Sequence, residues 1–263
     1  VGLAGQIYLL KANNSSDFYS FTPNASTGTW TTLTAVPLGD KATGDGKNPK
    51  KGAAIAAFDD KIYVLRGGNK PGFWRYTVTG GSWQKMPNIP TGANNPKDGA
   101  GMVYVSKDSN DCIFNMKGSK TSEFYLYFIN GDNWQTIASP STGTSGKAGY
   151  KNGSCLAYDG DSLVYVMKGN YGDFFRYNLL ANTWTELKQY DAKLFINREG
   201  KKKKVKDGSG LAYLDGAVYL LKGGKTNEFW KYDIGANNWL QMNPADLWDI
   251  PGDIKVKAGG ALC

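Results

Sequence analysis

The sequence predicts an all-β fold in which five repeated four-stranded units form a ring. Three observations support this prediction: an internal repeat, a strand-type pattern within each repeat, and a match between the two ends of the chain. The chain has 263 residues, of which 41% are hydrophobic and 34 are glycine. Hydrophobic content of this level is sufficient for a folded core and excludes a disordered chain.

The repeat is visible in four segments that are similar over their whole length. Each segment ends in a tryptophan, and the four span residues 50–83, 97–134, 151–184 and 206–239. A shorter segment at residues 6–30 matches them but lacks their opening strand. A repeat of about 50 residues indicates an architecture in which one structural unit recurs.

Each unit is predicted to contain four strands in a fixed order. The last unit contains a small Gly-rich strand (GSGLAY), an Asp-Gly turn, a β-branched and aromatic strand (AVYLL), an aromatic strand (EFWKYD) and a short strand that begins at Trp239. Hydrophobic residues alternate with period two, and turn residues separate the runs, which favours strands over helices. A repeat of this length with four strands is typical of a β-propeller blade.

The two ends of the chain complete each other in this pattern. The C-terminal stretch VKAGGALC (256–263) matches VKDGSGLA (205–212), which is the opening strand that the first unit lacks. We therefore expect a single five-bladed β-propeller over residues 1–263, closed by its N- and C-terminal strands, because a shared blade protects the sheet edges. The blades are expected at 256–263 plus 1–33, about 50–90, about 97–140, about 150–187 and about 205–242.

A finer motif recurs in the four complete units: a basic residue and glycine, then a tyrosine, six residues and a tryptophan. It occurs at Arg66-Gly67-Gly68 with Tyr76 and Trp83, Lys117-Gly118 with Tyr127 and Trp134, Lys168-Gly169 with Tyr177 and Trp184, and Lys222-Gly223-Gly224 with Tyr232 and Trp239. This motif resembles the kelch repeat, and the resemblance covers the whole chain. The first unit departs from it at Ala12 and Phe21, and kelch propellers usually have more than five blades. The variant is similar to repeats of bacterial and archaeal surface or secreted proteins, which implies the fold and little about activity.

Residue types limit the chemistry that the chain can perform. The sequence contains no histidine, which excludes Ser–His–Asp and Cys–His nucleophiles and His-ligated metals. Cys112, Cys155 and Cys263 lack metal-ligand spacing, so we expect three buried thiols, with a Cys112–Cys155 disulfide as the alternative. We expect no catalytic residue, no metal, no cofactor and no enzyme activity.

Basic residues are the main candidate for a functional site. Lys and Arg number 31 against 23 Asp and Glu, which gives a net charge of +8, and the loops of one face should carry the excess and attract anions. One basic residue opens each first strand and another ends each second strand, so ten cations are expected around the mouth of the central channel as a ligand-binding site. These are Lys11, Lys51, Arg66, Lys97, Lys117, Lys151, Lys168, Lys206, Lys222 and Lys257.

Acidic residues offer a structural alternative for these cations. Four units carry an acid just before the third strand, at Asp17, Glu123, Asp173 and Glu228, and each acid could pair with a repeat lysine inside or between blades. The run GKKKK (200–204) is expected to be a solvated loop or to add a non-specific anion contact. Base-specific nucleic-acid recognition is not expected, because arginine is scarce.

Aromatic residues are expected mainly between blades. The repeat tryptophans are expected to be structural: Trp30, Trp83, Trp134, Trp184 and Trp239. The adjacent aromatic pairs of the third strands are expected to be buried too, or, as the alternative, to stack on sugar rings: Phe73-Trp74, Phe124-Tyr125, Phe174-Phe175 and Phe229-Trp230. Burial is favoured because neighbouring residues of a strand point to opposite faces, and both faces of a blade are packed.

These observations favour a non-catalytic binding or scaffold module of an exported or cell-surface protein. Its basic face would engage an anionic glycan, another surface polymer or a protein partner. The alternatives are a multivalent lectin with one site per blade, a structural building block of a surface fibre, and a carbohydrate-active enzyme that uses two carboxylates. No apolar run is long enough to span a membrane, and the sequence leaves the oligomeric state open.

Overall fold

The structure is a computed structural model that describes residues 1–40, 45–187, 202–242 and 255–262. Within these ranges the chain forms strands β1 to β20 and no helix. Consecutive strands combine into five antiparallel sheets of four strands each, which form the blades of a β-propeller. The predicted all-β class and five four-stranded blades are therefore confirmed.

The strand bounds follow the repeat. The first blade contains β1 (Gly2–Leu3), β2 (Gln6–Leu10), β3 (Phe18–Thr22) and β4 (Thr29–Leu33). The second contains β5 (Ala54–Phe58), β6 (Lys61–Gly67), β7 (Lys70–Thr77) and β8 (Ser82–Met86). The third contains β9 (Gly101–Lys107), β10 (Asn110–Met116), β11 (Phe124–Phe128) and β12 (Asn133–Ile137). The fourth contains β13 (Cys155–Tyr158), β14 (Leu163–Met167), β15 (Phe174–Asn178) and β16 (Thr183–Glu186). The fifth contains β17 (Gly210–Leu214), β18 (Ala217–Leu221), β19 (Phe229–Asp233) and β20 (Asn238–Gln241).

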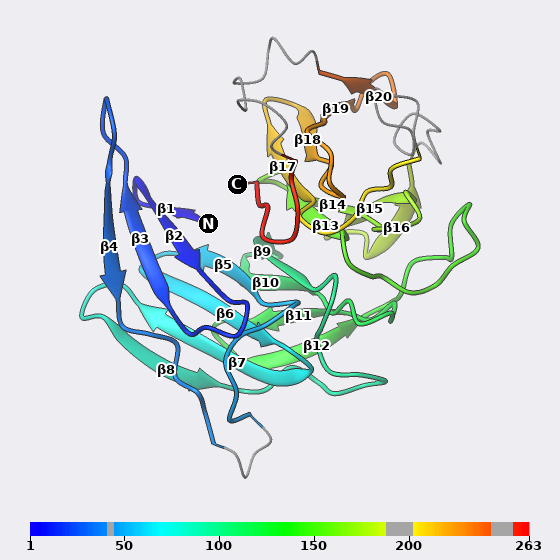
Figure 1. Cartoon of the computed structure of the whole chain (residues 1–263). Helices are drawn as coiled ribbons and strands as arrows, with labels where there is room; N and C mark the ends of the chain where they lie inside the picture. The colour runs from blue at the N-terminus through cyan, green and yellow to red at the C-terminus, as the bar shows by residue number, and fades with distance from the viewer. Residues whose placement is uncertain (41–44, 188–201, 243–254, 263) are drawn as a thin grey trace.

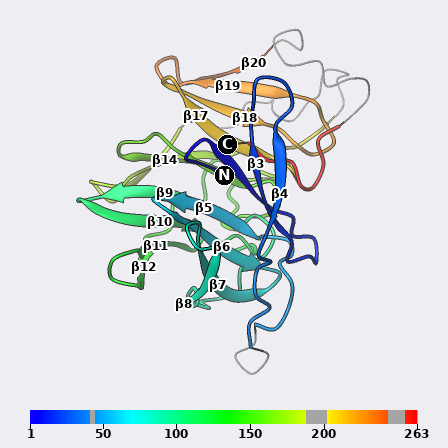
Figure 2. The ribbon, with the colours of Figure 1, turned by 90° about the vertical axis from the view of Figure 1, so that its left-hand side faces the viewer.

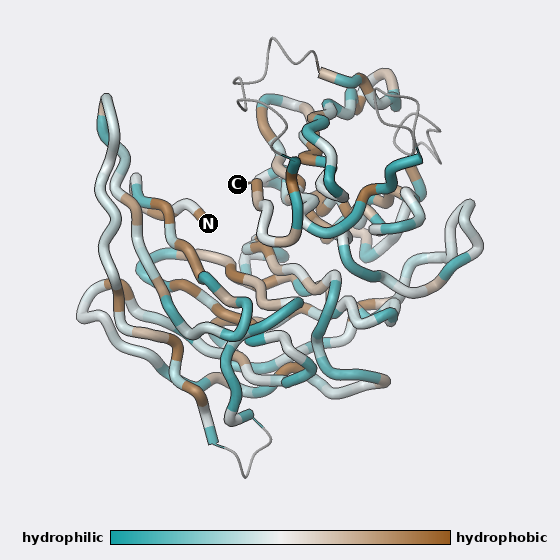
Figure 3. The backbone as a smooth tube through the Cα atoms, in the orientation of Figure 1, coloured by the Kyte–Doolittle hydropathy of each residue, from teal (hydrophilic) through white to brown (hydrophobic). Residues whose placement is uncertain are grey.

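The blades are arranged around a centre, as Figure 1 shows. The first strands β1, β5, β9, β13 and β17 lie towards the middle, and the fourth strands β4, β8, β12, β16 and β20 lie at the periphery. In the view turned by 90°, β19 and β20 of the fifth blade lie at the top and β7 and β8 of the second blade lie near the bottom (Figure 2). Hydrophobic residues are concentrated on the strands and hydrophilic residues in the loops (Figure 3). The residues just before the first strands of neighbouring blades approach closely, as Gly52 does to Lys97 and Gly99 to Lys151.

The core lies between neighbouring blades. Four clusters of buried side chains join the first blade to the second, the second to the third, the third to the fourth, and the fourth to the fifth. In the second of these clusters, for example, Tyr63 and Phe73 of one blade pack against Tyr127 of the next. Burial of apolar side chains on both faces of a sheet is the main source of its stability.

The repeat tryptophans form these junctions in four of the five blades. Each packs on a phenylalanine of the preceding blade, with ring centroids 4.8 to 5.3 Å apart: Trp83 on Phe18, Trp134 on Phe73, Trp184 on Phe124 and Trp239 on Phe174. Three of the indoles also donate a hydrogen bond to the connection that follows the preceding blade: Trp83 to Thr34 O, Trp134 to Pro87 O and Trp184 to Ala138 O. Trp30 differs, because its side chain is 56% exposed.

A backbone hydrogen bond of 2.8 to 2.9 Å marks every junction. A residue in the loop after the second strand donates its N–H to the carbonyl of the residue before the next opening lysine. The five pairs are Asn14 to Pro49, Asn69 to Pro96, Lys120 to Tyr150, Asn170 to Val205 and Lys225 to Val256. All five donors have φ between 64° and 70°, which asparagine tolerates better than most residues.

The ends of the chain differ from the expected closure. The innermost strand of the first blade is β1, not residues 256–263, because Ala4 and Gly5 adopt positive φ and fold the N-terminus back onto β2. The C-terminal segment bridges the fifth blade through Val256 and Thr226. Both termini lie in the space between the first and fifth blades (Figure 1).

Two of the three cysteines are described, and both are buried free thiols. Cys112 lies in β10 and Cys155 in β13, and they are not joined by a disulfide. The expectation of buried thiols is therefore confirmed for this pair. Cys263 lies outside the described residues.

Candidate functional site

The basic residues at the ends of the second strands lie inside the blades. Four of them have fully buried side chains: Arg66, Lys117, Lys168 and Lys222. Burial of an unpaired charge is costly, so each requires a carboxylate partner. The side chain of Lys11, the fifth member of the set, is 58% exposed.

The acids before the third strands pair with these lysines, as the structural alternative predicts. The nitrogen–oxygen distances are 2.9 Å for Lys11–Asp17, 2.7 Å for Lys117–Glu123, 3.1 Å for Lys168–Asp173 and 2.7 Å for Lys222–Glu228. Burial lowers the pKa of Lys222, and its hydrogen bond to Glu228 opposes this effect.

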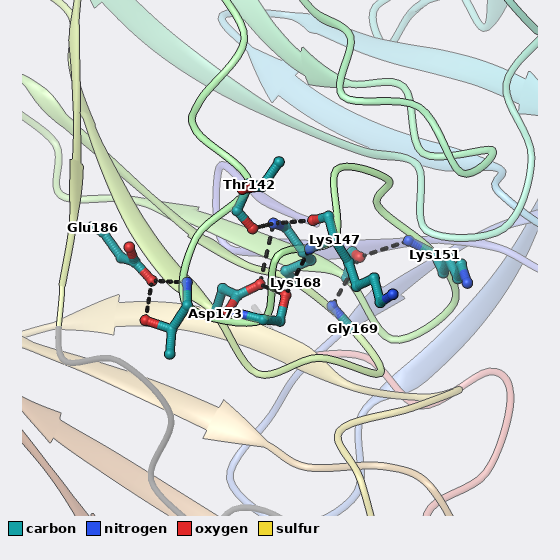
Figure 4. A network of polar contacts seen from close by, with 10 residues as sticks. Thr142, Lys147, Lys151, Lys168, Gly169, Asp173 and Glu186 are labelled. Carbon is teal, nitrogen blue, oxygen red and sulfur yellow. Dashed lines mark hydrogen bonds and ion pairs between the residues drawn. The ribbon is translucent and has the colours of Figure 1, made fainter.

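The fourth blade shows how such a pair is completed (Figure 4). The Lys168 ammonium donates to the carbonyls of Thr142 and Lys147, each at 2.8 Å, in addition to its contact with Asp173. Asp173 in turn accepts a 2.9 Å hydrogen bond from the backbone N–H of Ser145. The pair therefore fixes the connection from the third blade to the fourth, and the charges of both side chains are satisfied.

The second blade builds the same arrangement from a different part of the sequence. Gly72 occupies the position that carries the acid in the other blades. The carboxylate of Asp45 fills the space that the acidic side chain would take. A Cβ on Gly72 would lie 2.3 Å from Asp45 Oδ1, while Asp45 Oδ1 lies 2.8 Å from Arg66 Nε. The Arg66 guanidinium also donates to the carbonyls of Pro37 and Lys47. Burial lowers the pKa of Arg66, and the charge of Asp45 opposes this effect.

Apart from Lys11, which is exposed and paired with Asp17, these contacts divide the expected cations into two sets. Arg66, Lys117, Lys168 and Lys222 are buried and bound to carboxylates and carbonyls, so a ligand in solvent cannot contact their side chains. The lysines that open the first strands remain on the surface: Lys51, Lys97, Lys206 and Lys257 are exposed, and Lys151 is half-buried.

The structure corrects the register of the opening set in the second blade. The opening lysines accept a hydrogen bond on their carbonyl from the residue three positions later, as in the contact of Ala100 N–H with Lys97 O. In the second blade the corresponding acceptor is the carbonyl of Lys50, which binds the N–H of Ala53. Lys50 is thus the equivalent of Lys97, and Lys51 is its neighbour. Two consecutive lysines made this register ambiguous in the sequence.

Six lysines line a pocket beside the fifth blade. This fifth-blade pocket has a volume of about 580 Å³, and its charged lining consists of Lys202, Lys203, Lys204, Lys206, Lys225, Lys257 and Asp207. Six ammonium groups against one carboxylate create a strongly positive local potential, which attracts anions and raises their association rate.

A pocket at the third blade has the same construction. This third-blade pocket, of about 310 Å³, is lined by Lys97, Lys120, Lys151, Asp98, Ser119, Asn69, Asn94 and Asn152. Lys97, Lys120 and Lys151 correspond to Lys206, Lys225 and Lys257 of the fifth-blade pocket. Each pocket therefore joins two opening lysines of neighbouring blades with one lysine of the loop after a second strand.

The ten expected cations did not include Lys120 and Lys225, the loop lysines of the two pockets, although both lie in loops of the predicted basic face. They lie three residues after Lys117 and Lys222, so the repeat alignment contained the signal. The run 200–204 was recognised, and its described part, Lys202 to Lys204, lies in the fifth-blade pocket next to Lys206.

The paired aromatics of the third strands do not form exposed stacking platforms. Seven of the eight side chains are buried: Phe73, Trp74, Phe124, Tyr125, Phe174, Phe175 and Trp230. Phe229 is half-buried at the open side of the fifth blade. The expectation of burial is confirmed for those seven, and they offer no surface to a sugar ring.

Among the described residues, no group of three or more Asp, Glu or Cys side chains is placed to hold a metal ion. The described part of the chain also has no helix with the length and apolarity needed to cross a membrane.

The fold and these pockets define the protein as a five-bladed β-propeller with a lysine-rich face. No family model matches the sequence, and no curated protein matches it. A solved structure, described as "Structure of YjhT", is similar with a TM-score of 0.63 and 12% sequence identity, and the match covers 92% of this chain and 82% of that chain. At this level of identity the similarity shows the fold alone.

Proposed function

We propose that this chain is a non-catalytic binding module of an exported or cell-surface protein, with a kelch-type repeat, and that its lysine-rich face binds an anionic glycan. The observation that carries the proposal is the fifth-blade pocket, in which six lysines face one aspartate. Such a surface favours a ligand with several sulfate or carboxylate groups, because each anionic group can contact a separate ammonium group.

The division of the cations supports this proposal. Four repeat cations are buried in ion pairs and stabilise the blades. The lysines of the pockets are not part of these buried ion pairs. Closely spaced exposed lysines repel each other, and an anionic ligand would relieve that repulsion. The repeated construction of the two pockets also suits an extended ligand that contacts more than one blade.

Binding of a heparin octasaccharide at two salt concentrations tests the proposal. We expect measurable binding at about 50 mM NaCl and much weaker binding at about 300 mM, because salt screens these contacts. The double variant Lys225→Asn, Lys257→Ala should lose about tenfold in affinity at low salt, which corresponds to about 1.4 kcal/mol. Asparagine is chosen at position 225 because it occupies the equivalent position in three other blades.

A charge-matched control separates the pocket from the overall charge. The variant Lys61→Ala, Lys231→Ala also removes two cations but leaves both pockets intact. It should bind the octasaccharide nearly as well as the unmodified protein. An equal loss in both variants would show attraction by net charge alone, and no binding at low salt would reject the glycan proposal.

A further inference from the structure

The third blade has another pocket, at the end of its strands that points away from the lysine-rich face. Strand β10 starts at this end and runs towards Lys117 and Lys120, whereas β11 ends here and β12 starts here. The pocket has a volume of about 460 Å³, a size suited to a small ligand. This amide pocket is lined mainly by Asn110, Asp111, Phe128, Asn130, Asn133 and Gln135.

The amide pocket exists because the inner hairpin of the third blade is longer than its counterparts. Strands β9 and β10 pair over seven residues, whereas β5 and β6, like β17 and β18, pair over five. The N–H of Ile129 binds the carbonyl of Asp111, as Val78 binds Asp60 in the second blade. Asp60 belongs to a turn, but Asp111 belongs to a strand. Asn110 and Asp111 therefore extend past the end of β11 and form one wall of the pocket.

The strand register places four of the lining side chains on one face of the blade. Residues paired across antiparallel strands share a face, and so do residues two positions apart on one strand. Cys112 pairs with Phe128, and Phe128 pairs with Asn133. Asn110 lies two residues from Cys112, and Gln135 lies two residues from Asn133. On this face, an amide from β10 and two amides from β12 therefore flank the aromatic side chain of β11.

Phe128 replaces a residue that stabilises the following turn in two other blades. Its equivalents, Asn178 and Asp233, pair with the residue before the repeat tryptophan in the same way. They accept hydrogen bonds from backbone N–H groups of that turn, which a phenyl ring cannot do. Phe128 packs on the core shared with the fourth blade but is only half-buried. The turn has no use for this ring, and its accessible part can contact a ligand.

The amides around this ring are free to bind a ligand. The side chains of Asn130, Asn133 and Gln135 are exposed and make no hydrogen bond to another described residue. Asn110 donates its Nδ2 to the carbonyl of Asp108 and keeps its Oδ1 as an acceptor. An amide offers both donors and an acceptor, which is the combination that a sugar hydroxyl requires.

The charge of the amide pocket suits an uncharged ligand. Among the described residues that line it, Asp111 is the only charged one, and its Oδ1 accepts a 2.7 Å hydrogen bond from the Tyr104 hydroxyl. An anionic sugar would meet this carboxylate without a cation to offset the repulsion. The aromatic ring, by contrast, suits the C–H face of any pyranose, because it combines a large apolar area with a fixed orientation.

We propose that the amide pocket binds a neutral hexopyranose, with the C–H face of the sugar on Phe128 and its hydroxyls on the amides of Asn110, Asn133 and Gln135. This site is separate from the lysine-rich face, since the two lie at opposite ends of the strands. The chain then carries an anion-binding face at one end and a neutral-sugar site at the other.

Saturation-transfer difference NMR with methyl β-D-glucoside, methyl β-D-galactoside and methyl α-D-mannoside tests this site. We expect at least one of the three to bind with a dissociation constant of about 1–10 mM, as suits a ligand of this size. The double variant Asn133→Ala, Gln135→Ala should weaken that binding at least about tenfold. Phe128→Asn, which introduces the residue of the fourth blade, should weaken it to a similar extent.

A matched variant of the fourth blade is the control. Thr183→Ala, Thr185→Ala changes the equivalent positions of β16 and should leave sugar binding unchanged. The melting temperatures of both double variants should stay within about 2 °C of the unmodified protein, since the changed side chains are exposed.

Three outcomes would overturn the proposal. These are no binding of any of the three sugars, equal binding by the two double variants, and tighter binding of methyl β-D-glucuronide than of the neutral glycosides. Loss of heparin binding in Lys225→Asn, Lys257→Ala bears only on the lysine-rich face, so the two sites fail independently. Sugar binding at about 50 and 300 mM NaCl should be equal, because no ion pair contributes to it.

Discussion

Asp45 shows that a buried cation in this protein requires a carboxylate at a fixed point in space, but not at a fixed point in the sequence. In the third and fourth blades the carboxylate comes from the residue before the third strand. In the second blade it comes from the preceding connection, and Gly72 leaves the space that it occupies. A carboxylate beside a buried guanidinium offsets the cost of removing that charge from water.

Loss of the carboxylate at position 45 should therefore be compensated by a carboxylate introduced at position 72. Asp45→Ala should destabilise the protein by about 3–5 kcal/mol, because it leaves Arg66 buried and unpaired. Gly72→Asp alone should also destabilise it, because the new side chain collides with Asp45. The double variant should recover much of the loss, since the aspartate at position 72 takes the place that Asp17 and Asp173 have in their blades.

Urea unfolding of the four proteins of this cycle measures the effect. A favourable coupling energy of about 2 kcal/mol or more between the two positions is expected. Additive losses would show that position 72, which lies within β7, cannot supply the carboxylate.

At the scale of single residues, the sequence predicted the ion-pair partners of the buried cations where the repeat was regular. The pairs of Lys117, Lys168 and Lys222 with their acids could be predicted because the spacing recurs. Asp45 could not, because its contact with Arg66 joins residues from different parts of a unit, and no repeat aligns them. The absence of an acid at Gly72 was the signal that another residue must supply the charge.

At the scale of strands and junctions, glycine permits the close approach of neighbouring blades. A Cβ on Gly99 would lie 2.0 Å from the carbonyl oxygen of Lys151, and one on Gly153 would lie 2.4 Å from the Cα of Lys206. Gly99 also has a φ of 81°, which most residues adopt only with strain. The glycines that precede the first strands are therefore a requirement of the junction.

The variant Gly99→Ala should separate the steric effect of a Cβ from the strain of the positive φ. Gly160 has a similar φ of 87° but no neighbour within 4 Å of its Cβ position, so Gly160→Ala should cost only the backbone strain, about 1–2 kcal/mol. Gly99→Ala should cost about 1–3 kcal/mol more, because the methyl group pushes the third and fourth blades apart. Equal losses of unfolding free energy in the two variants would contradict this account.

The elements themselves were predictable to different degrees. Strands that form continuous apolar runs between turn residues, such as β14 and β18, lie where the pattern placed them. The innermost strand of the first blade was predicted incorrectly, because the similarity of residues 256–263 to an opening strand concealed the short hairpin that Ala4 and Gly5 form. Likeness between repeats indicates equivalent positions, but it does not decide which of two segments pairs with β2.

At the scale of the whole molecule, burial of weak acids makes stability depend on alkaline pH. Burial raises the pKa of Cys112 to about 12 and also raises the pKa of Tyr63 and Tyr165. The unfolded chain ionises such groups near their ordinary values of about 9 to 10, while the folded chain retains their protons. Loss of protons from the unfolded state alone stabilises that state as the pH rises.

The free energy of unfolding should therefore decrease from about pH 9 upwards. Lys222 and Lys85 act in the opposite direction because burial lowers their pKa, but they are fewer than the buried acids. Urea denaturation at about pH 7.5, 9 and 10.5 measures the change, with the ionic strength held constant. A midpoint that stays constant or rises through this range would contradict the expected effect.

The overall architecture was predictable because it repeats. Four similar segments and one partial segment sufficed to predict five blades, and the structure contains five sheets of four strands. The binding surface was less predictable, since it depends on which lysines are buried. The repeat lysines that open the first strands and those that end the second strands look alike in the sequence, yet Lys117 is fully buried and Lys97 is exposed.

The contacts of Lys168 also make the spacing of the blades independent of the length of the chain that connects them. Its ammonium holds the carbonyls of Thr142 and Lys147, so the span between these residues is fixed at both ends. Residues outside the span, such as the exposed Ser139 and Ser141, lie on the side of the preceding blade. Insertions there can accumulate without moving the sheets, and a repeat protein of this design can diversify its connections while the ring keeps its dimensions.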